Sequence, residues 1–320
     1  MIMPTPNQTS RNGLWRKQTE MTLTPPQDEL PNHQTAPMGT LNRPGRVLLG
    51  WMSDHDGALA LAGRNAALAA TSEELRIRVI AARASVASRA PYQLPAEVVT
   101  TDHPDLVLIE QRLRQAPDAV SFWAEGWRLA MVDLRHVCSL QPTVNTEDAL
   151  ERVAAVTDDD PITVAAVTLP ASAPTELPVQ FDPTRNTWLV NAPNPNLRII
   201  GTFAPAAQPG GAGIALGFLI GITASFLQVA LHHGRPVLRD GYHRAYGLLA
   251  RGIRHVPAFV RDFGQSDLGV GPGLFPPDVY LSTQPPLLTD FLDDDVAASI
   301  GIPISQKMLV IQGLELTPLA

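Results

Sequence analysis

The sequence contains a single cysteine, Cys138, among its 320 residues. One cysteine excludes an intrachain disulfide framework and any zinc site built from several cysteines. Cys138 lies in the apolar run VDLRHVCSL, which favours a small buried side chain over a nucleophile. The motifs G-x-S-x-G, H-E-x-x-H and C-x-x-C are also missing, which removes several classes of hydrolase and metalloenzyme.

Charged residues make up only 17% of the chain and hydrophobic residues 45%, a balance typical of a globular protein with a substantial core. The formal net charge of −7 argues against a general nucleic-acid-binding protein, so DNA is not an expected partner. The N-terminus lacks the apolar segment of a signal peptide, and we expect a cytoplasmic protein. Residues 1–44 are rich in Pro, Thr, Gln and Asn, which predicts a disordered tail.

The uncharged run IALGFLIGITASFLQVAL, residues 214–231, reaches the lower length limit of a membrane-spanning helix. Its polar residues, two glycines, and β-branched and aromatic content instead favour strands. The chain then continues directly into a polar segment. We therefore expect this run to form buried sheet in a soluble protein, with no membrane partner.

The pattern of propensities predicts an α/β (α+β) fold in three regions. Residues 45–120 are alanine-rich and helical in propensity, with Ser72 as the expected N-cap of EELRIRVIAARASVA. Residues 121–262 mix strand-like and helical segments and form the predicted core. Residues 263–320 form an extension packed around that core. The helical region is the expected surface for any protein partner.

Within the predicted core, residues 121–140 are aromatic and β-branched, which predicts a strand. A helix is expected to begin at Asn145 or Thr146. Short apolar segments follow between proline and asparagine turns, and we expect strands in PITVAAVTLP (161–170), LPVQFDP and TWLVNA. Residues at about 157–213, which end in the loop-like APAAQPGGAG, interrupt the core as an insertion.

No metal site is predicted from the sequence. His232 and His233 are adjacent, so on a strand they would face opposite sides of the sheet. The acidic run DDD at 293–295, on a short predicted helix, is typical of a solvated face.

The segment RDGYHRAYGLLARGIRHVPAFV, residues 239–260, predicts a strand, a glycine turn, a helix and a return strand. The first strand ends at Asp240, Gly241 permits a sharp turn, and the helix is expected to run to about Ala250. A helix N-terminus after a glycine presents free backbone N–H groups and the positive end of the helix dipole. This arrangement suits an anion.

We predict that this turn binds a phosphate. The predicted site comprises Asp240, Gly241, Tyr242, His243 and Arg244. Arg244 carries a permanently charged fork that a phosphate can fill, so it is the expected principal contact, with His243 as a second donor. A solvated helix start, paired locally with Asp240, explains the same residues without a ligand, and Asp240 suits a capping role better than that of a general base.

The order of these residues resembles the hallmark segment of the ParB/sulfiredoxin superfamily. The matching residues are Gly241, Arg244, Ala245, Gly252, Ile253, Val256 and Pro257. A weaker likeness in VDLRHVCSLQPTVNTEDALERVAAV extends the resemblance to the family's opening strand and first helix. Members of this family grip nucleotide phosphates: ParB proteins bind and hydrolyse CTP, sulfiredoxin uses ATP, and free-serine kinases transfer phosphate. The resemblance therefore implies ATP, CTP or a phosphorylated small molecule as ligand, with Mg²⁺ as a candidate companion.

Three departures from the family pattern narrow this expectation. Tyr242 stands where sulfiredoxin has its catalytic cysteine, so cysteine-sulfinate reduction is not expected. The proline-rich stretch after Asp262 leaves no room for the helix-turn-helix of partition proteins. We identify no counterpart of the kinase's catalytic glutamate.

The leading expectation is a nucleotide- or phosphate-ligand-binding protein, with or without slow hydrolysis and with its catalytic residues unassigned. A small-molecule phosphotransferase is the first alternative, and it requires a carboxylate base and Mg²⁺ beside the phosphate. An interaction module with a decayed site is the second. A cleft that joins Arg244, His243 and a carboxylate would favour the enzyme, whereas a filled cleft would favour the interaction module.

Overall fold

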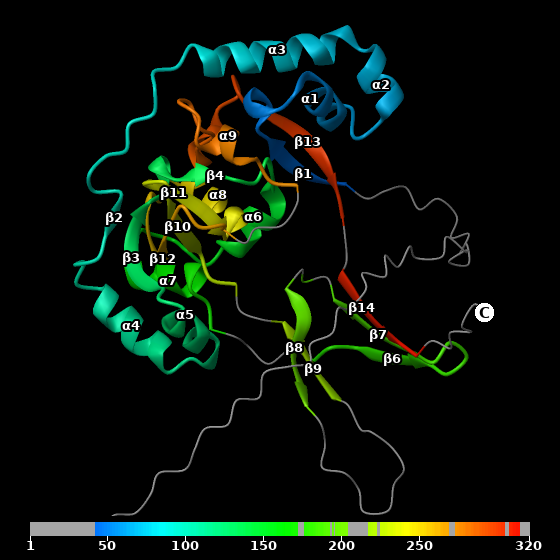
Figure 1. Ribbon diagram of the computed structural model, residues 1–320, viewed down its shortest axis with the longest axis vertical. Coiled ribbons are helices and arrows are strands. Elements are labelled where there is room, and N and C mark those ends of the chain that lie inside the picture. The colour runs from blue at the N-terminus through cyan, green and yellow to red at the C-terminus, as the bar shows by residue number, and fades with distance from the viewer. Residues whose placement is uncertain are drawn as a thin grey trace, which may run out of the picture. The chain divides into compact units, whose positions relative to one another are not determined.

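The computed structural model describes residues 42–171, 176–192, 194, 196–203, 217–222, 225–268, 273–304 and 307–313. These residues form a mixed α/β structure with several sheets (Figure 1). Residues 1–41 of the predicted tail, and the predicted loop at 204–213, lie outside the described residues. The strand β1 (Asn42–Val47) begins inside the last positions of that predicted tail.

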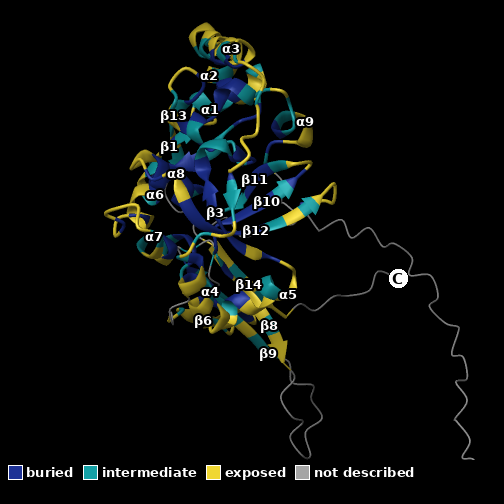
Figure 2. Cartoon of the chain, turned by 90° about the vertical axis from the view of Figure 1, so that its left-hand side faces the viewer, coloured by how far each residue is buried: buried dark blue, intermediate teal, exposed yellow. Residues whose placement is uncertain are grey.

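A six-stranded mixed sheet lies at the centre of the core, in the order β2-β3-β12-β10-β11-β4. The strands are β2 (Val99–Thr100), β3 (Arg128–Asp133), β4 (Cys138–Ser139), β10 (Gln228–His232), β11 (Arg235–Asp240) and β12 (His255–Gly264). The pairs β10–β12 and β11–β4 are parallel, and the remaining pairs are antiparallel. Figure 2 shows buried residues along β3, β10, β12 and the helix α8 (Tyr242–Ala250).

The predicted order of strand, glycine turn, helix and return strand is confirmed. The strands β10 and β11 form a hairpin whose turn residues His233 and Gly234 both have positive φ, 49° and 74°. A tight two-residue hairpin requires that backbone conformation. Gly241 is the N-cap of α8 with φ 99°, and a Cβ there would lie 3.0 Å from Leu227 Cγ. Both the backbone conformation and the close packing therefore require glycine at this turn.

The helix α6 (Thr146–Arg152) packs directly against α8. Asn145 is its N-cap and accepts a hydrogen bond from the Asp148 N–H at 3.0 Å, which confirms the predicted helix start. A Cβ at Gly247 of α8 would lie 2.4 Å from the Ala149 carbonyl oxygen, so only glycine permits this approach. The contact brings the C-terminal half of α6 to the beginning of α8.

The predicted strand at 161–170 is wrong, because the structure has the helix α7 (Pro161–Thr168) there. Asp160 caps this helix by accepting a hydrogen bond from the Thr163 N–H at 2.9 Å, and Pro161 occupies the first turn, where a missing N–H costs nothing. Val164 and Ala165 are fully buried in the two apolar clusters of the core. The cap and the tertiary packing outweigh the strand propensity of the β-branched residues.

The predicted strand at 121–140 is also shorter than expected. The structure has the helix α5 (Val120–Ala124) first, and strand begins only at Arg128. Phe122 stacks on Phe259 of β12 with ring centroids 4.9 Å apart, and meets Phe226 edge-on at 5.0 Å. The aromatic residues of this segment thus pack from a helix against the sheet.

The N-terminal region is helical, as predicted, but it also supplies a strand. Its helices are α1 (Asp54–Leu61), α2 (Ala66–Thr71), α3 (Glu73–Ala87) and α4 (Leu106–Arg114). Ser72 is the N-cap of α3, as expected, and accepts from the Leu75 N–H. The strand β1 pairs with β5 (Thr143–Asn145) of the core and with β13 (Ala298–Pro303) of the C-terminal extension. All three predicted regions thus meet in one sheet.

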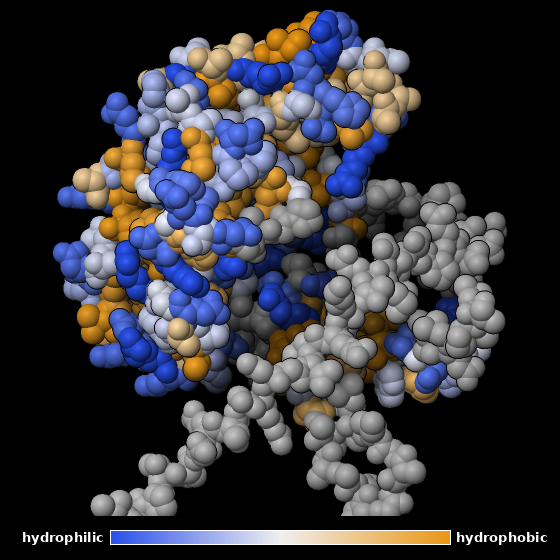
Figure 3. Space-filling model, viewed as in Figure 1, coloured by the Kyte–Doolittle hydropathy of each residue, from blue (hydrophilic) through white to orange (hydrophobic). Residues whose placement is uncertain are grey.

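Short elements connect these parts. They are the 3₁₀ helices η1 (Leu49–Trp51), η2 (Pro117–Ala119), η3 (Leu134–His136) and η4 (Leu288–Leu292), and the helix α9 (Pro277–Tyr280). Apolar side chains remain exposed on the outer helices, among them Ile77 of α3 and Leu108 of α4. Figure 3 shows such apolar patches interleaved with hydrophilic side chains, as is usual on protein surfaces.

The insertion forms small sheets of its own. The strands β6 (Val179–Asp182) and β7 (Thr187–Ala192) were predicted. They pair with each other, and β7 also pairs with β14 (Lys307–Gln312) from the C-terminal extension. The strands β8 (Leu197–Phe203) and β9 (Gly217–Ile222) form a hairpin. In the 214–231 run the structure has strand at 217–222 and from 228 onward, as predicted, but residues 225–227 are not strand, and only β10 is largely buried. In the described part of the chain, no helix has the length and apolar character needed to cross a membrane.

Candidate functional site: a cleft at the N-terminus of α8

A cleft of about 1110 Å³ opens at the first turn of α8. Its wall includes residues from β1, β5, α6, β11 and α8. Figure 1 shows α6, α8 and β11 close together. All five residues of the predicted site, Asp240, Gly241, Tyr242, His243 and Arg244, line this single cleft. We call it the α8 cleft.

Arg244 is buried, with 5% of its surface exposed, and its guanidinium is already bound by the protein. Its Nη1 donates to the carbonyl oxygens of Val167, at 3.2 Å, and of Ser225, while its Nη2 donates to the Ser225 hydroxyl at 2.8 Å. Burial lowers the pKa of Arg244 to about 10, so it remains positively charged at neutral pH. These contacts tie the end of α7 and residue 225 to α8. They suit a positioning role better than the predicted role of principal phosphate contact.

Asp240 holds the glycine turn rather than the helix itself. Its Oδ1 accepts from the Gly241 N–H at 2.6 Å, and its Oδ2 accepts from the Ser225 hydroxyl at 3.1 Å. Among the described residues, no side chain caps the first turn of α8. The backbone N–H groups of that turn, which lack partners within the helix, therefore remain available.

Tyr242, although it lines the cleft, is held by the core of the protein. Its hydroxyl donates to the Leu238 carbonyl and accepts from the Leu140 N–H at 3.2 Å. Burial raises the pKa of Tyr242 far above its usual range, so the hydroxyl stays protonated. The side chain connects α8 to β11 and to the residue after β4.

His243, Arg152 and the acidic Glu151 line the α8 cleft, and within the described ranges no side-chain hydrogen bond or ion pair holds them. Burial lowers the pKa of the half-buried His243, and the charge of Arg152 acts in the same direction. The Arg152 side chain is exposed. The neighbouring Arg43, by contrast, is bound to Asp148 and lies 3.6 Å from Glu147.

Sequence reasoning missed the contribution of α6 to the site. Asp148, Glu151 and Arg152 all line the cleft, and their spacing of three and four residues places them on one face of the helix. That spacing was readable in the sequence. What it could not reveal was that this face meets α8, since the approach depends on the long-range contact at Gly247.

The structure describes no metal cluster: within the residues it covers, no group of three or more His, Cys, Asp or Glu side chains is placed to hold an ion. His232 and His233 do not lie on opposite faces as expected. Their rings are in edge-to-face contact, with centroids 4.5 Å apart, because His233 has left the strand for the hairpin turn. His232 Nδ1 instead lies 3.3 Å from the Tyr280 hydroxyl.

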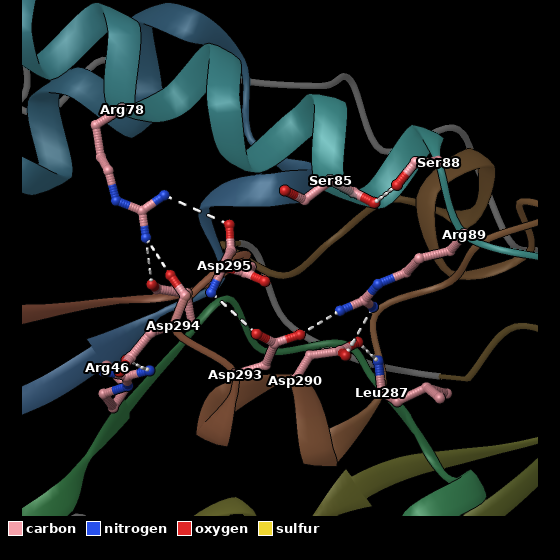
Figure 4. A network of polar contacts seen from close by, with 11 residues as sticks. Arg46, Arg78, Ser85, Ser88, Arg89, Leu287, Asp290, Asp293, Asp294 and Asp295 are labelled. Carbon is pink, nitrogen blue, oxygen red and sulfur yellow. Dashed lines mark hydrogen bonds and ion pairs between the residues drawn. The ribbon is translucent and has the colours of Figure 1, made fainter.

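The acidic run near the C-terminus is bound by arginines (Figure 4). Arg89 pairs with Asp290 and Asp293, each at 2.8 Å, and Arg46 pairs with Asp294 at 2.7 Å. The acidic run does not lie on the predicted helix, because η4 ends at Leu292. The run is solvated, as predicted, but it is also ion-paired. The Asp294 side chain is 88% exposed, yet it is ion-paired.

No family model matches the chain, and neither a curated protein nor a solved structure matches it. The functional proposal therefore rests on the geometry of the α8 cleft and on the sequence of the β11–α8–β12 segment.

Proposed function

We propose that the protein binds a small molecule through its phosphate groups in the α8 cleft. The observation that carries this proposal is that Arg152, exposed and without an acidic partner among the described residues, shares the cleft with the uncapped first turn of α8. Backbone N–H groups, the helix dipole and a guanidinium fork each favour a phosphate. Arg244 then acts as a positioning residue that fixes the wall of the cleft.

The cleft is large enough for a nucleotide, because pockets for drug-sized ligands are typically about 300–1,000 Å³. Asp148, Glu151 and Asp240 also line it, and their charges repel a phosphate while accepting hydrogen bonds from hydroxyl or amino groups. A nucleoside attached to the phosphates suits this mixture. ATP and CTP, which the likeness to the ParB/sulfiredoxin superfamily implies, are therefore the first ligands to test.

We further propose a ParB/sulfiredoxin-like core for this chain. The succession of β11, a left-handed glycine, α8 and β12 supports it. Mg²⁺ is proposed only as a companion of the ligand's phosphates, since Mg²⁺ in nucleotide sites is held largely by substrate oxygens and water. That arrangement agrees with the lack of a metal cluster among the described residues.

A phosphotransferase remains the second candidate. The observation that favours it is that a carboxylate, Asp240, lines the same cleft as His243 and Arg244. The third expectation, an interaction module with a decayed site, is less favoured because the cleft is open rather than filled by side chains.

Thermal denaturation and calorimetric titration of the full chain test the binding proposal. We expect ATP or CTP to raise the melting temperature in a saturable way, because a ligand that binds only the folded state stabilises it. Adenosine and cytidine, which lack phosphate, serve as controls and should have much smaller effects. The proposal is wrong if neither nucleotide, with or without Mg²⁺, raises the melting temperature or gives a binding isotherm.

A further inference from the structure

The Ser225 hydroxyl, at the edge of the α8 cleft, lies between the guanidinium of Arg244 and the carboxylate of Asp240. Ser225 is partly exposed and lines the cleft beside α8. Its Oγ receives a hydrogen bond from Arg244 Nη2 at 2.8 Å and lies 3.1 Å from Asp240 Oδ2. A guanidinium can only donate and an ionised carboxylate can only accept. The hydroxyl proton therefore points at Asp240.

A backbone hydrogen bond fixes the orientation of the Asp240 carboxylate, as a general base requires. Its second oxygen, Oδ1, accepts from the Gly241 N–H at 2.6 Å, so the carboxylate cannot rotate away without losing that bond. A nucleophile within hydrogen-bond reach of a base, and a base oriented by a third group, is the arrangement that activates serine in enzymes. Ser225, Asp240 and the Gly241 N–H have this relation.

Arg244 completes the environment of the oxygen. Its charge is fixed beside Ser225 Oγ by the bonds to the Val167 and Ser225 carbonyls, and it favours negative charge developing on that oxygen. A serine oxygen has two lone pairs. Arg244 takes one of them, and the other is left for an electrophile in the cleft.

We propose that Ser225 is a nucleophile that accepts a phosphoryl group from a nucleoside triphosphate bound in the α8 cleft. This proposal rests on the proposed function. Ser225 Oγ attacks the terminal phosphorus, and an Oγ–P bond forms. The bond from that phosphorus to the bridging oxygen breaks, and its electron pair leaves with the nucleoside diphosphate. The hydroxyl proton passes to Asp240, and the products are phosphoserine 225 and the diphosphate.

Labelling of the full chain tests this step. The protein is incubated with MgCl₂ and with ATP or CTP that carries a labelled terminal phosphate, and intact mass and peptide mapping then locate any transferred group. We expect one phosphoryl group per chain, on Ser225. Ser225→Ala should abolish it, and Asp240→Asn, which keeps an oxygen for the Gly241 N–H, should slow transfer roughly a hundredfold or more, as loss of a general base does.

Ser88→Ala is the matched control, because it removes an exposed serine hydroxyl at the C-terminal end of α3, outside the α8 cleft, that donates only to a backbone carbonyl. It should be labelled like the wild type. Mapping on the wild type needs no variant, so misfolding of Ser225→Ala cannot obscure the result.

The outcomes separate the two proposals. If ATP or CTP raises the melting temperature but no phosphoryl group reaches the chain, or it maps to another residue, the Ser225 proposal is wrong and the binding proposal stands. Equal labelling rates for Asp240→Asn and the wild type would exclude Asp240 as the base and overturn the mechanism. If neither nucleotide binds, both proposals are wrong.

Discussion

Two groups of arginines in this protein differ in what their guanidinium groups bind. Around the acidic run, Arg46 and Arg89 pair with carboxylates, and Arg78 donates to the carbonyl oxygens of Asp294, Asp295 and Ala297 (Figure 4). In the α8 cleft, Arg152 has no such partner within the described part of the chain.

This difference distinguishes arginines that hold the fold together from an arginine that can bind a ligand. A hollow of about 460 Å³ beside Arg46 and Arg78 is also lined by Asp294 and Asp295. Arg46 is ion-paired with Asp294, and Arg78 already donates to backbone carbonyl oxygens. Arginines of this kind join the strand β1 and the helix α3 to the segment after η4. The α8 cleft is also lined by the carboxylates of Asp148, Glu151 and Asp240, but none of them is ion-paired with Arg152 in the described part of the chain, so its N–H donors remain available to an anion. The number of arginines around a hollow is therefore a poorer guide to a ligand site than their existing partners.

Arg244 lines the α8 cleft, yet its guanidinium is bound by the protein. Of the changes predicted here, its replacement should have the largest effect, a loss of stability. Arg244→Ala leaves the carbonyl oxygens of Val167 and Ser225 without their donor, so we expect a loss of about 2–4 kcal/mol in the free energy of unfolding, because each unsatisfied buried group costs about 1–3 kcal/mol. Arg244→Lys should lose less, because it keeps the charge and part of the hydrogen bonding. Urea denaturation measures both. A stable Arg244→Ala protein that fails to bind nucleotide would instead return Arg244 to the role of direct phosphate contact.

The segment around Arg244 shows how much of the fold and of the site could be predicted from the sequence. The end of β11 at Asp240, the turn at Gly241 and the helix α8 all follow from short-range signals, and they were predicted with nearly their observed bounds. The five predicted site residues do share one cleft. Local turn chemistry and a 3.6-residue period were sufficient for that part.

The errors have a common origin in contacts between distant segments. Residues 161–170 were assigned to a strand, although Asp160 and Pro161 form a recognisable helix start. The end of the resulting helix α7 supplies the Val167 carbonyl that binds Arg244, so the strand assignment concealed the reason for burying that side chain. Arg152 was missed because its place in the site depends on the packing of Ala149 against Gly247, which no local pattern reveals.

Arg152→Ala should have the next largest effect. It should weaken nucleotide binding and leave the stability of the fold almost unchanged. We expect a loss of about 1.5–3 kcal/mol in nucleotide affinity, the value of a charge-assisted hydrogen bond, or roughly ten- to a hundredfold in Kd. Stability should change by less than about 0.5 kcal/mol, as for other exposed sites. Arg76→Ala, which removes an exposed arginine paired with Glu73 on α3, is the matched control and should bind as the wild type does. Equal affinity of the two variants would place the ligand elsewhere.

Arg89→Ala should reverse that pattern, with a cost in stability and none in binding. The Asp290 carboxylate is buried, burial raises its pKa, and Arg89 opposes that rise. Without Arg89 the ionised form is left without its cation, and we expect a loss of about 1–3 kcal/mol at neutral pH. As the pH falls, Asp290 takes up a proton in the folded protein before it would in the unfolded chain, and a protonated Asp290 no longer needs Arg89. The loss of stability caused by Arg89→Ala should therefore shrink over the pH range in which Asp290 protonates. Chemical denaturation at several pH values measures this, and a loss that does not vary with pH would show that Asp290 is not its source.

His243→Gln should have the smallest effect and the most specific pH dependence. Burial and the charge of Arg152 lower the pKa of His243, so the unfolded chain binds a proton on this residue more readily than the folded protein does. The sign follows: the wild type loses stability as the pH falls through the ordinary range of histidine, near 6.5, and regains it above that range. Glutamine cannot titrate, so this part of the pH dependence of stability should disappear in the variant. At neutral pH the nucleotide affinity should fall by about 1 kcal/mol or less, the value of a neutral hydrogen bond.

Melting temperatures of the wild type and of His243→Gln across that pH range measure the effect on stability. Parallel profiles would mean that His243 titrates alike in the folded and unfolded states, and the imidazole would then lie in open solvent rather than in the wall of the cleft.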